Sequence, residues 1–328
     1  MERMLTGLQP TGSITLGNYI GSIKQMIEYQ DKYDSYIFIA DMHAITVPQE
    51  PEKLASNIKN LIAIYLACGL DPNKNTIFLQ SDNIYHANVS WILECLTPYG
   101  ELGRMTQFKD KSRKHQNFSA GLLTYPVLMA SDILIYDADF VPTGQDQKQH
   151  VELARNIAER VNKKYNKNIF RIPNPLIPTE GAKIMDLVDP TKKMSKSEEN
   201  PKGVIYLLDE ESVIRKKIMG ATTDSEMSVK FDFENKPGIS NLISLICVVD
   251  NMTIEEANRK YKDYNYKDFK TEVADTICNF IKNIQDKFYE YRYNEEYLRN
   301  ILASGANKAR KIANKKMIEV KEKLGLKI

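Results

Sequence analysis

The sequence of 328 residues predicts an α/β fold, in which a doubly wound parallel sheet carries a helical insertion and is followed by an α-helical domain. Three observations predict this arrangement. Apolar runs alternate with amphipathic stretches through residues 1–83, which is the strand–helix–strand rhythm of a parallel sheet. From about residue 84 to 136 the pattern is helical and interrupts that rhythm. After Pro201 nearly all of the periodicity is helical.

Buried strands are expected where short apolar runs are bounded by turn-forming residues. Four such runs occupy residues 4–8, 35–40, 76–80 and 140–142. Amphipathic helices are expected where apolar side chains recur at helical spacing, at residues 19–27, 51–68 and 151–161. Because the carboxyl ends of parallel strands meet at one edge of a sheet, the polar residues that follow these strands are expected to line one crevice.

The remaining segments have less regular patterns. A helix is expected around residues 89–102, whereas residues 106–117 are polar and basic and are expected to lack rigid structure. Residues 172–200 are rich in Pro and Lys and are predicted as loops around a short element at 182–187. Further helices are predicted to start near Asp209, Thr253 and Tyr266.

The composition is that of an ordinary globular protein, with 42% hydrophobic and 27% charged residues. No apolar run is long enough to span a bilayer, and the first residues lack the apolar segment of a signal peptide, so a cytoplasmic location is expected. The four cysteines have no C-x-x-C spacing and are predicted to be reduced core residues rather than zinc ligands. Nine Lys or Arg against two Glu give residues 299–328 a local basic excess on a helical segment.

Residues 9–21 lie between the first predicted strand and its helix and hold three glycines and a proline. A strand, a tight turn and a helix N-terminus direct free backbone N–H groups and the positive end of the helix dipole at one point, which makes an anion site. The dinucleotide fingerprint and the P-loop are both absent. An ordinary turn between a strand and a helix remains the alternative for the glycines alone.

Two short motifs carry a resemblance to a known family. Residues 15–18, Thr-Leu-Gly-Asn, are similar to the HIGH signature of the class I aminoacyl-tRNA synthetases, and residues 193–197, Lys-Met-Ser-Lys-Ser, match their KMSKS signature. Further segments resemble the bacterial tryptophanyl-tRNA synthetases, at residues 9–12, 41–46, 144–150 and 188–192. The ordered set runs through nearly the whole chain.

The resemblance implies a division of the chain and a reaction. Residues 1–200 would form a Rossmann-like catalytic domain, with the helical insertion at about 84–136, and residues 201–328 a helical tRNA- and anticodon-binding domain. The enzyme would activate L-tryptophan with ATP, forming tryptophanyl-adenylate and pyrophosphate, and then transfer the tryptophanyl group to tRNA(Trp). Such a protein holds reactants in line and neutralises the charge of the leaving pyrophosphate. Mg²⁺ is expected with ATP, held mainly by phosphate oxygens and water, without a dedicated metal site in the protein.

The resemblance also implies the residues that contact ATP. They are Gln9, Pro10, Thr11, Gly17, Asn18, Gly144, Gln145, Asp146, Ile184, Lys193, Met194, Ser195, Lys196 and Ser197. Asn18 would donate to a phosphate, although helix capping is an equally compatible role for Thr15 and Asn18. Asp146 would bind a ribose hydroxyl or a substrate amino group. The family more often has Glu at position 145, so Gln145 departs from its pattern.

Three lysines are expected to assist the chemistry. Lys193 and Lys196 lie in a stretch too polar for a core, and their ammonium groups would follow the charge that develops on the β- and γ-phosphates. Lys111, in the basic stretch of the insertion, resembles a third such lysine. The alternative for Lys111 is an exposed, solvated charge.

The choice of amino acid is expected to come from Tyr125, Met129 and Asp132, which share one helix face by their spacing. An unpaired carboxylate at Asp132, among apolar neighbours, would be costly, and an indole N–H is a donor that would satisfy it. The resemblance adds Leu5 and Val141 as apolar walls of the ring pocket, and His43 and Gln147 at the polar end of the amino acid. Core packing for Tyr125 and Met129, and a simple hydrogen-bonded role for His43, remain alternatives.

No role is predicted for Thr143, His86, His115 or His150. The competing functions are a tyrosyl-tRNA synthetase, a small nucleotidyltransferase and a synthetase-derived RNA-binding protein without catalysis. The helix expected at residues 89–102 bears more large apolar groups than one face buries, and the resembled family is homodimeric. A two-fold homodimer that uses this region is therefore expected, with cover for the sheet edge as the alternative.

Overall fold

The computed structural model describes residues 1–10, 12–114, 118–144, 147–176, 184–194 and 200–326. At its centre lies a five-stranded sheet in the order β3-β2-β1-β4-β5. The strands are β1 (Arg3–Leu8), β2 (Asp34–Ile39), β3 (Asn75–Leu79), β4 (Phe140–Pro142) and β5 (Asn174–Leu176). All neighbouring pairs are parallel, so the predicted doubly wound parallel sheet is confirmed. The strand order reverses between β1 and β4, which opens a crevice at their carboxyl ends.

Four of these strands agree with the predicted runs, and β5 was not predicted. It lies in the segment expected to form loops, and it pairs with β4 through Phe140 and Asn174. With three residues, one of them Pro175, the strand is too short to show a period. A proline is tolerated there because β5 is an edge strand.

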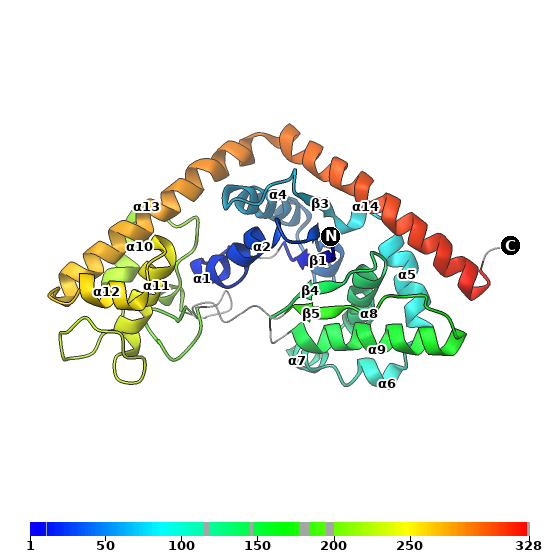
Figure 1. Cartoon of the computed structure of the whole chain (residues 1–328), viewed down its shortest axis with the longest axis horizontal. Coiled ribbons are helices and arrows are strands. Elements are labelled where there is room, and N and C mark those ends of the chain that lie inside the picture. Colours follow the sequence, from blue (N-terminus) through cyan, green and yellow to red (C-terminus); the bar gives the residue numbers. More distant parts are fainter. Residues whose placement is uncertain (11, 115–117, 145–146, 177–183, 195–199, 327–328) are drawn as a thin grey trace.

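Helices cover both faces of the sheet (Figure 1). Along β2 the side chains alternate between two cores: Ile37 and Ile39 pack with α4, and Tyr36 and Phe38 pack with α8 and α9. The helices of the N-terminal half are α1 (Leu16–Asn18), a π-turn at Tyr19–Ile23, α2 (Lys24–Tyr29), α3 (Asp41–Ala44) and α4 (Pro51–Ala67). Helix α9 (Lys148–Tyr165) follows β4.

The insertion between β3 and β4 is helical, as predicted, but two of its details differ from the prediction. Its helices are α5 (Tyr85–Glu94), α6 (Tyr99–Leu102), α7 (Thr106–Lys114) and α8 (Ala120–Leu134). The single helix expected at 89–102 is two helices, because Pro98 lacks the N–H that a continuous helix requires. The stretch expected to lack rigid structure contains α7 at residues 106–114, which has no Gly or Pro, and Phe108 packs edge-on against Phe118.

The C-terminal part is helical from residue 201 onward, with the predicted helix starts near Asp209, Thr253 and Tyr266. The helices are α10 (Glu211–Met219), α11 (Pro237–Asp250), α12 (Ile254–Lys260), α13 (Tyr266–Tyr293) and α14 (Glu295–Leu324). Thr253 caps α12 by a reciprocal bond with Glu256. Among the described helices, none by itself has the length and apolar character to span a membrane, and one bent pair, α11 with α12 at 108°, meets those criteria by length and composition.

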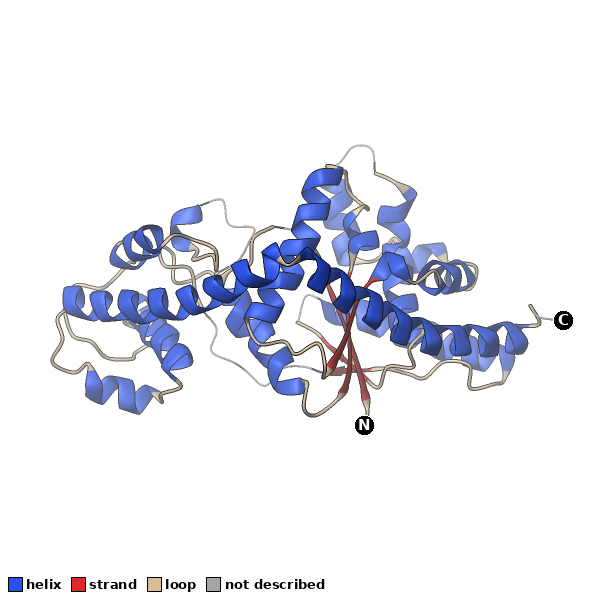
Figure 2. Ribbon diagram, turned by 90° about the horizontal axis from the view of Figure 1, so that it is seen from above, coloured by secondary structure: helices blue, strands red, loops and turns tan. Residues whose placement is uncertain are grey.

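Helix α14 returns to the sheet. In Figure 1 α13 and α14 form a bent arch over the molecule, and in Figure 2 α14 crosses the strands. A Cβ on Gly305 would lie 1.8 Å from the Ile77 carbonyl oxygen, so α14 packs directly on the backbone of β3. The functional division at residue 200 stays a prediction, but in space the last helix packs on the N-terminal sheet.

Candidate active site

A cavity of about 520 Å³ opens at the crevice between β1 and β4. All the residues predicted to hold the amino acid line it: Leu5, His43, Tyr125, Met129, Asp132, Val141 and Gln147. They come from β1, β4, α3 and α8 and from the residue before α9, so only the tertiary fold brings them together. The cavity is mostly apolar with a few polar groups, as small-molecule sites commonly are.

Several lining residues were missed by the sequence analysis. Gly7 gives Phe38 its place, since a Cβ on Gly7 would lie 2.6 Å from the Phe38 ring. Side chains alternate between the two faces of a strand, so the sequence of β2 would have placed Phe38 on the same face as Tyr36. Gln107 was missed because its segment was expected not to be rigid. Thr143, left without a role, also lines the cavity.

Asp132 is fully buried and is the centre of a hydrogen-bond network. His43 donates from Nε2 to Oδ2 at 2.8 Å, and His86 donates from Nδ1 to Oδ1 at 2.6 Å. Gln80 Nε2 bridges both oxygens, at 2.8 and 3.0 Å. Burial alone would raise the pKa of Asp132, but the hydrogen bonds and charge interactions of His43 and His86 lower it to about 2. The carboxylate is therefore ionised at neutral pH.

A second set of bonds fixes His86. Its Nε2 lies 2.9 Å from the Tyr136 hydroxyl, which also accepts a bond from Asn83 Nδ2 at 2.6 Å. Burial raises the pKa of Tyr136, so the phenol stays protonated. The Tyr136 hydroxyl therefore contacts one ring nitrogen of His86, while the other, Nδ1, donates to Asp132. His86, for which no role was predicted, thus supports the acid at the cavity.

Tyr125 is held in a similar way. Its hydroxyl oxygen lies 3.0 Å from His150 Nε2 and 3.3 Å from Gln107 Oε1. Burial raises the pKa of Tyr125 to about 12, so its hydroxyl is neutral at physiological pH. His150, another residue without a predicted role, lies behind the cavity wall and orients Tyr125.

The turn at residues 15–18 begins a helical run that continues into α2. Asn18 N–H donates to Thr15 Oγ1 at 3.0 Å, and Thr15 N–H donates to Asn18 Oδ1 at 3.1 Å. Both residues therefore cap the helix, which was the alternative considered for them. Capping engages the Oδ1 atom of Asn18, so the role of its Nδ2 donor in binding a phosphate stays a prediction.

The second motif lies against the first. Met194 is 1% exposed, and a Cβ on Gly17 would lie 3.0 Å from its carbonyl oxygen. A short hairpin holds Met194: its N–H donates to Ile184 O at 3.0 Å, and Met185 pairs with Lys193. Lys193 is exposed. The side chain of Ile184, a predicted ATP contact, is buried in the core.

Other predicted ATP contacts have different settings. Gln9 lines the cavity, Gly144 is exposed and Pro10 is buried. Outside the described residues lie Thr11, Gln145, Asp146, Ser195, Lys196 and Ser197, and Lys111 is described only as part of the backbone of α7. Within the described part of the chain, no group of three His, Cys, Asp or Glu side chains is placed to hold a metal ion.

The sequence of this chain is similar to those of known proteins. Residues 1–282 match the family described as tRNA synthetases class I (W and Y). A tryptophan–tRNA ligase of Bacillus subtilis (strain 168) is 53% identical over 325 residues, which cover 99% of this chain and 98% of that protein. The corresponding ligase of Malacoplasma penetrans (strain HF-2) is 50% identical over 331 residues, covering 99% of this chain and 98% of its own.

Solved structures of tryptophanyl-tRNA synthetases are similar to this one over nearly the whole chain. Tryptophanyl-tRNA synthetase from Mycoplasma pneumoniae has a TM-score of 0.86 and 38% identity, and covers 100% of this chain and 98% of its own. The enzyme from Campylobacter jejuni, complexed with ADP and tryptophan, has the same TM-score and identity and covers 98% and 99%. A tyrosyl-tRNA synthetase from Aeropyrum pernix, 19% identical with a TM-score of 0.62 and covering 89% of each chain, shares the fold alone.

Proposed function

The chain belongs to the class I tRNA synthetases of the W and Y family, and we propose that it activates L-tryptophan with ATP and transfers the tryptophanyl group to tRNA(Trp). The observation that carries this proposal is the cavity at the switch point of the sheet, lined by apolar walls and by the ionised carboxylate of Asp132. An aromatic ring with one N–H fits that combination of shape and charge.

In the proposed ground state, the indole ring lies between Leu5, Val141 and Met129, and its N–H donates to Asp132. Gln147 lies near the polar end of the amino acid. The substrate carboxylate then attacks the α-phosphorus of ATP in line with the departing pyrophosphate, and the protein forms no covalent bond. Support for this orientation comes from the positions of Asp132, in the last turn of α8, and of Gln147, just before α9.

ATP lies, in this proposal, across the turn at Gly17 and the hairpin at Lys193. Lys193, Lys196 and Lys111 stabilise the negative charge that grows on the β- and γ-phosphates. Mg²⁺ is bound mainly through phosphate oxygens and water, as its hydration chemistry favours. The contact between Gly17 and Met194 supports a nucleotide site that both motifs share.

Amino-acid-dependent exchange of pyrophosphate into ATP tests the proposal. Each of the twenty amino acids is supplied in turn, and exchange is expected with tryptophan alone. Exchange that depends on tyrosine would replace the proposal by the tyrosyl function. Exchange without any amino acid would favour a nucleotidyltransferase, and no exchange at all would favour a binding protein.

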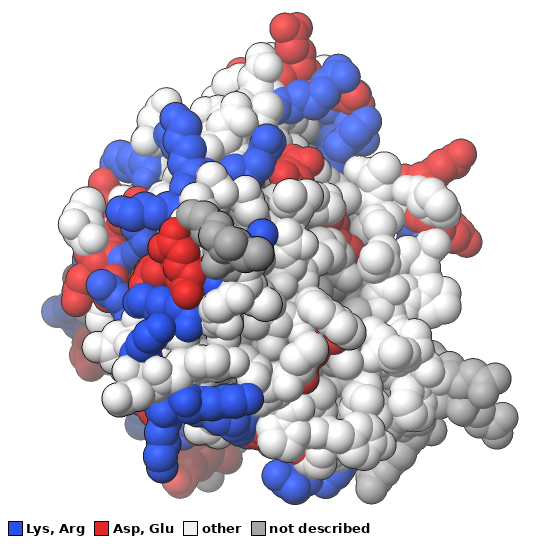
Figure 3. Space-filling view, turned by 90° about the vertical axis from the view of Figure 1, so that its right-hand side faces the viewer, with Lys and Arg blue, Asp and Glu red and all other residues white. Residues whose placement is uncertain are grey.

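tRNA is proposed to bind along the helical part of the chain and the basic side of α14. A tRNA-charging enzyme is expected in the cytoplasm, and we propose that location. Lys308, Arg310, Lys311 and Lys315 are exposed on α14. In the face seen in Figure 3, most Lys and Arg lie along one side, with Asp and Glu among them, and uncharged side chains occupy much of the remainder. Charges on one side suit a polyanion, because phosphate contacts release counterions.

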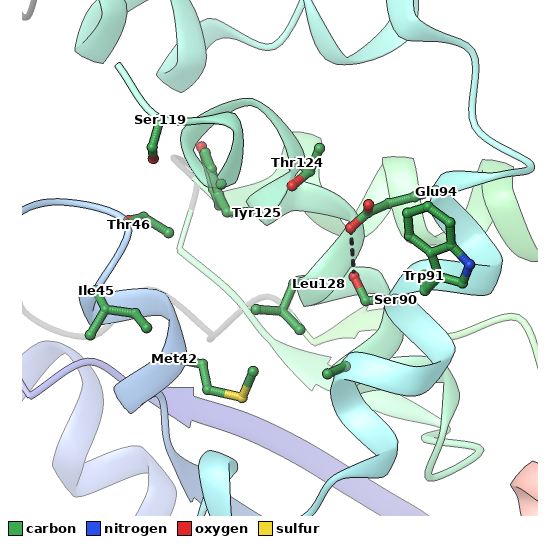
Figure 4. A pocket seen from close by; sticks show the side chains of 12 residues that line it. Met42, Ile45, Thr46, Ser90, Trp91, Glu94, Ser119, Thr124, Tyr125 and Leu128 are labelled. Atoms are coloured by element: carbon green, nitrogen blue, oxygen red, sulfur yellow. Dashed lines mark hydrogen bonds between the residues drawn. The ribbon is translucent and has the colours of Figure 1, made fainter. Parts of the chain in front are cut away.

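We infer that the uncharged surface next to α5 is covered by a second copy of the chain. Trp91 is 68% exposed and Ile45 64% exposed, and with Met42 and Leu128 they surround a hollow of about 360 Å³ (Figure 4). A large apolar patch with a hollow at its centre is typical of a subunit interface. Because Tyr125 lines both this hollow and the amino-acid cavity, the interface would adjoin the active site.

Sedimentation velocity at micromolar concentration tests the dimer. The wild type is expected to sediment as a dimer and Trp91→Lys as a monomer. Tyr293→Lys is the matched control, because Tyr293 is also an exposed aromatic residue, at 80%, but lies at the end of α13. A wild-type monomer with full activity would refute the inference.

A further inference from the structure

Protein donors surround the carboxylate of Asp132. A carboxylate offers about four lone-pair positions. Oδ1 accepts from His86 and Gln80, and Oδ2 accepts from His43 and Gln80. Asp132 is also 0% exposed although it lines the cavity. The proposed indole N–H must therefore compete with the protein donors for this carboxylate.

The three donors differ in their freedom to leave. His86 and Gln80 are each 0% exposed, and neither lines the cavity. His86 is held at three points: Nδ1 by Asp132, Nε2 by the Tyr136 hydroxyl, and its carbonyl oxygen by Ser131 Oγ at 2.6 Å. Displacing either donor would leave buried polar atoms without partners, which is unfavourable.

His43 is in a different position. It is 9% exposed, lines the cavity and comes from α3, a helix of four residues. Its Nε2–H makes the bond to Asp132 Oδ2 from the cavity side, and its ring lies edge-on to that of Tyr125. Of the three donors, His43 is the one that faces a ligand and the one whose released N–H would be in the cavity.

We propose that His43 is an exchangeable donor, whose Nε2–H occupies in the empty enzyme the position on Asp132 Oδ2 that the indole N–H takes when tryptophan binds. This inference rests on the proposed function. No proton changes place: one N–H···O bond breaks, another forms, and the carboxylate stays ionised. His86 and Gln80 keep their bonds throughout and hold the carboxylate in position.

The exchange has two consequences for recognition. Until the substrate binds, His43 joins His86 and Gln80 in satisfying the buried carboxylate. A ring that displaces His43 without bringing an N–H leaves one acceptor position of Asp132 empty, so such a ring is rejected. The released imidazole then lies in the cavity beside the substrate, where it can hydrogen-bond to the polar end of the amino acid, the role that the family resemblance implies for His43.

Proton NMR of the full-length enzyme labelled with ¹⁵N-histidine tests the exchange. The sequence contains four histidines, so the hydrogen-bonded side-chain N–H signals are few, and His43→Gln and His86→Asn assign them. In the empty enzyme both the His43 Nε2–H and the His86 Nδ1–H are expected in the downfield, hydrogen-bonded region. Saturation with tryptophan should remove the His43 signal from that region and leave the His86 signal in place. Addition of ATP alone should move neither.

Titration calorimetry on the same sample measures whether tryptophan binds, which separates a failure of the exchange from a failure of the proposed function. If tryptophan saturates the enzyme and the His43 signal does not move, the exchange is refuted while the proposed function stands. If the His86 signal moves instead, the assignment of the fixed and exchangeable donors is reversed and the proposal is refuted. If no tryptophan binds, the proposed function is contradicted and this inference with it.

Discussion

Gly17 lies against the backbone of Met194, so closely that a Cβ at Gly17 would be 3.0 Å from the Met194 carbonyl oxygen and 3.3 Å from its Cβ. The turn that begins the first helix and the hairpin that carries Lys193 are therefore in direct contact. Met194 is buried, and its N–H is bonded to Ile184, so the hairpin is held from both sides. This contact fixes the distance between the two parts of the proposed nucleotide site.

Gly17→Ala is expected to slow adenylate formation by about tenfold, because the added methyl group must push the hairpin away by a few tenths of an ångström. Pyrophosphate exchange measures the rate. Gly21→Ala is the matched control in the same helical run, since a Cβ there would meet no atom within 4 Å. Equal rates for the two variants would show that the contact between the motifs does not set the geometry of the site.

Lys196→Ala is expected to lower the rate of adenylate formation by about a hundred- to a thousandfold, with a much smaller effect on ATP affinity. The physical reason is that the ammonium group strengthens its contact only as charge moves to the leaving pyrophosphate. Single-turnover kinetics give the rate, and equilibrium binding gives the affinity. An effect confined to the Michaelis constant for ATP would instead indicate that Lys196 binds the ground state and the transition state equally.

Neutralising four of the exposed basic residues of α14 is expected to weaken tRNA charging, to lessen its salt dependence and to spare pyrophosphate exchange. The changes are Lys308→Gln, Arg310→Gln, Lys311→Gln and Lys315→Gln. Lys316 is left in place because it is buried and pairs with Asp137 at 2.8 Å. A variant with Lys32, Lys53, Lys163 and Lys164 changed to Gln alters the net charge equally. A similar loss of charging in both variants would mean that α14 is not the tRNA surface.

The lowered pKa of Asp132 leads to a prediction of how the free energy of unfolding depends on pH. Its pKa in the folded protein, about 2, lies below the ordinary value of 3.8, so folding favours the ionised form. The stabilisation is present above the ordinary pKa and is lost as the pH falls through the window from about 4 to about 2. Urea unfolding of wild type and Asp132→Asn should give a difference in unfolding free energy that is constant above about pH 5 and shrinks by roughly 2 kcal/mol in acid. A difference independent of pH would contradict the charged network.

The sequence predicts the central elements of the fold well, for a physical reason. Strands buried on both faces are short apolar runs, and the predicted runs agree with β1 to β4. The elements that it missed have weak local signals. Strand β5 has three residues and exists because β4 offers it an edge, and α7 is too polar to show an apolar stripe.

The site shows the same limit. The sequence indicates that Asp132 needs a partner, but its donors lie 46 to 89 positions away along the chain, on three other elements. Only the fold brings His43, Gln80 and His86 to one carboxylate. A buried histidine has no periodic signature, so His86 could not be distinguished from a surface residue by its neighbours in the sequence.

The central claim is that the carboxylate of Asp132 recognises the N–H of an indole ring. The most direct measurement is pyrophosphate exchange with tryptophan and with its analogue in which sulfur replaces the ring N–H, using the wild type and Asp132→Asn. The wild type is expected to prefer tryptophan by about a hundredfold or more in kcat/KM, because the analogue displaces His43 and leaves one acceptor position of the buried carboxylate empty. Asp132→Asn should use tryptophan about tenfold less well and discriminate less, since the charge is gone. Equal use of both compounds by the wild type would contradict the account.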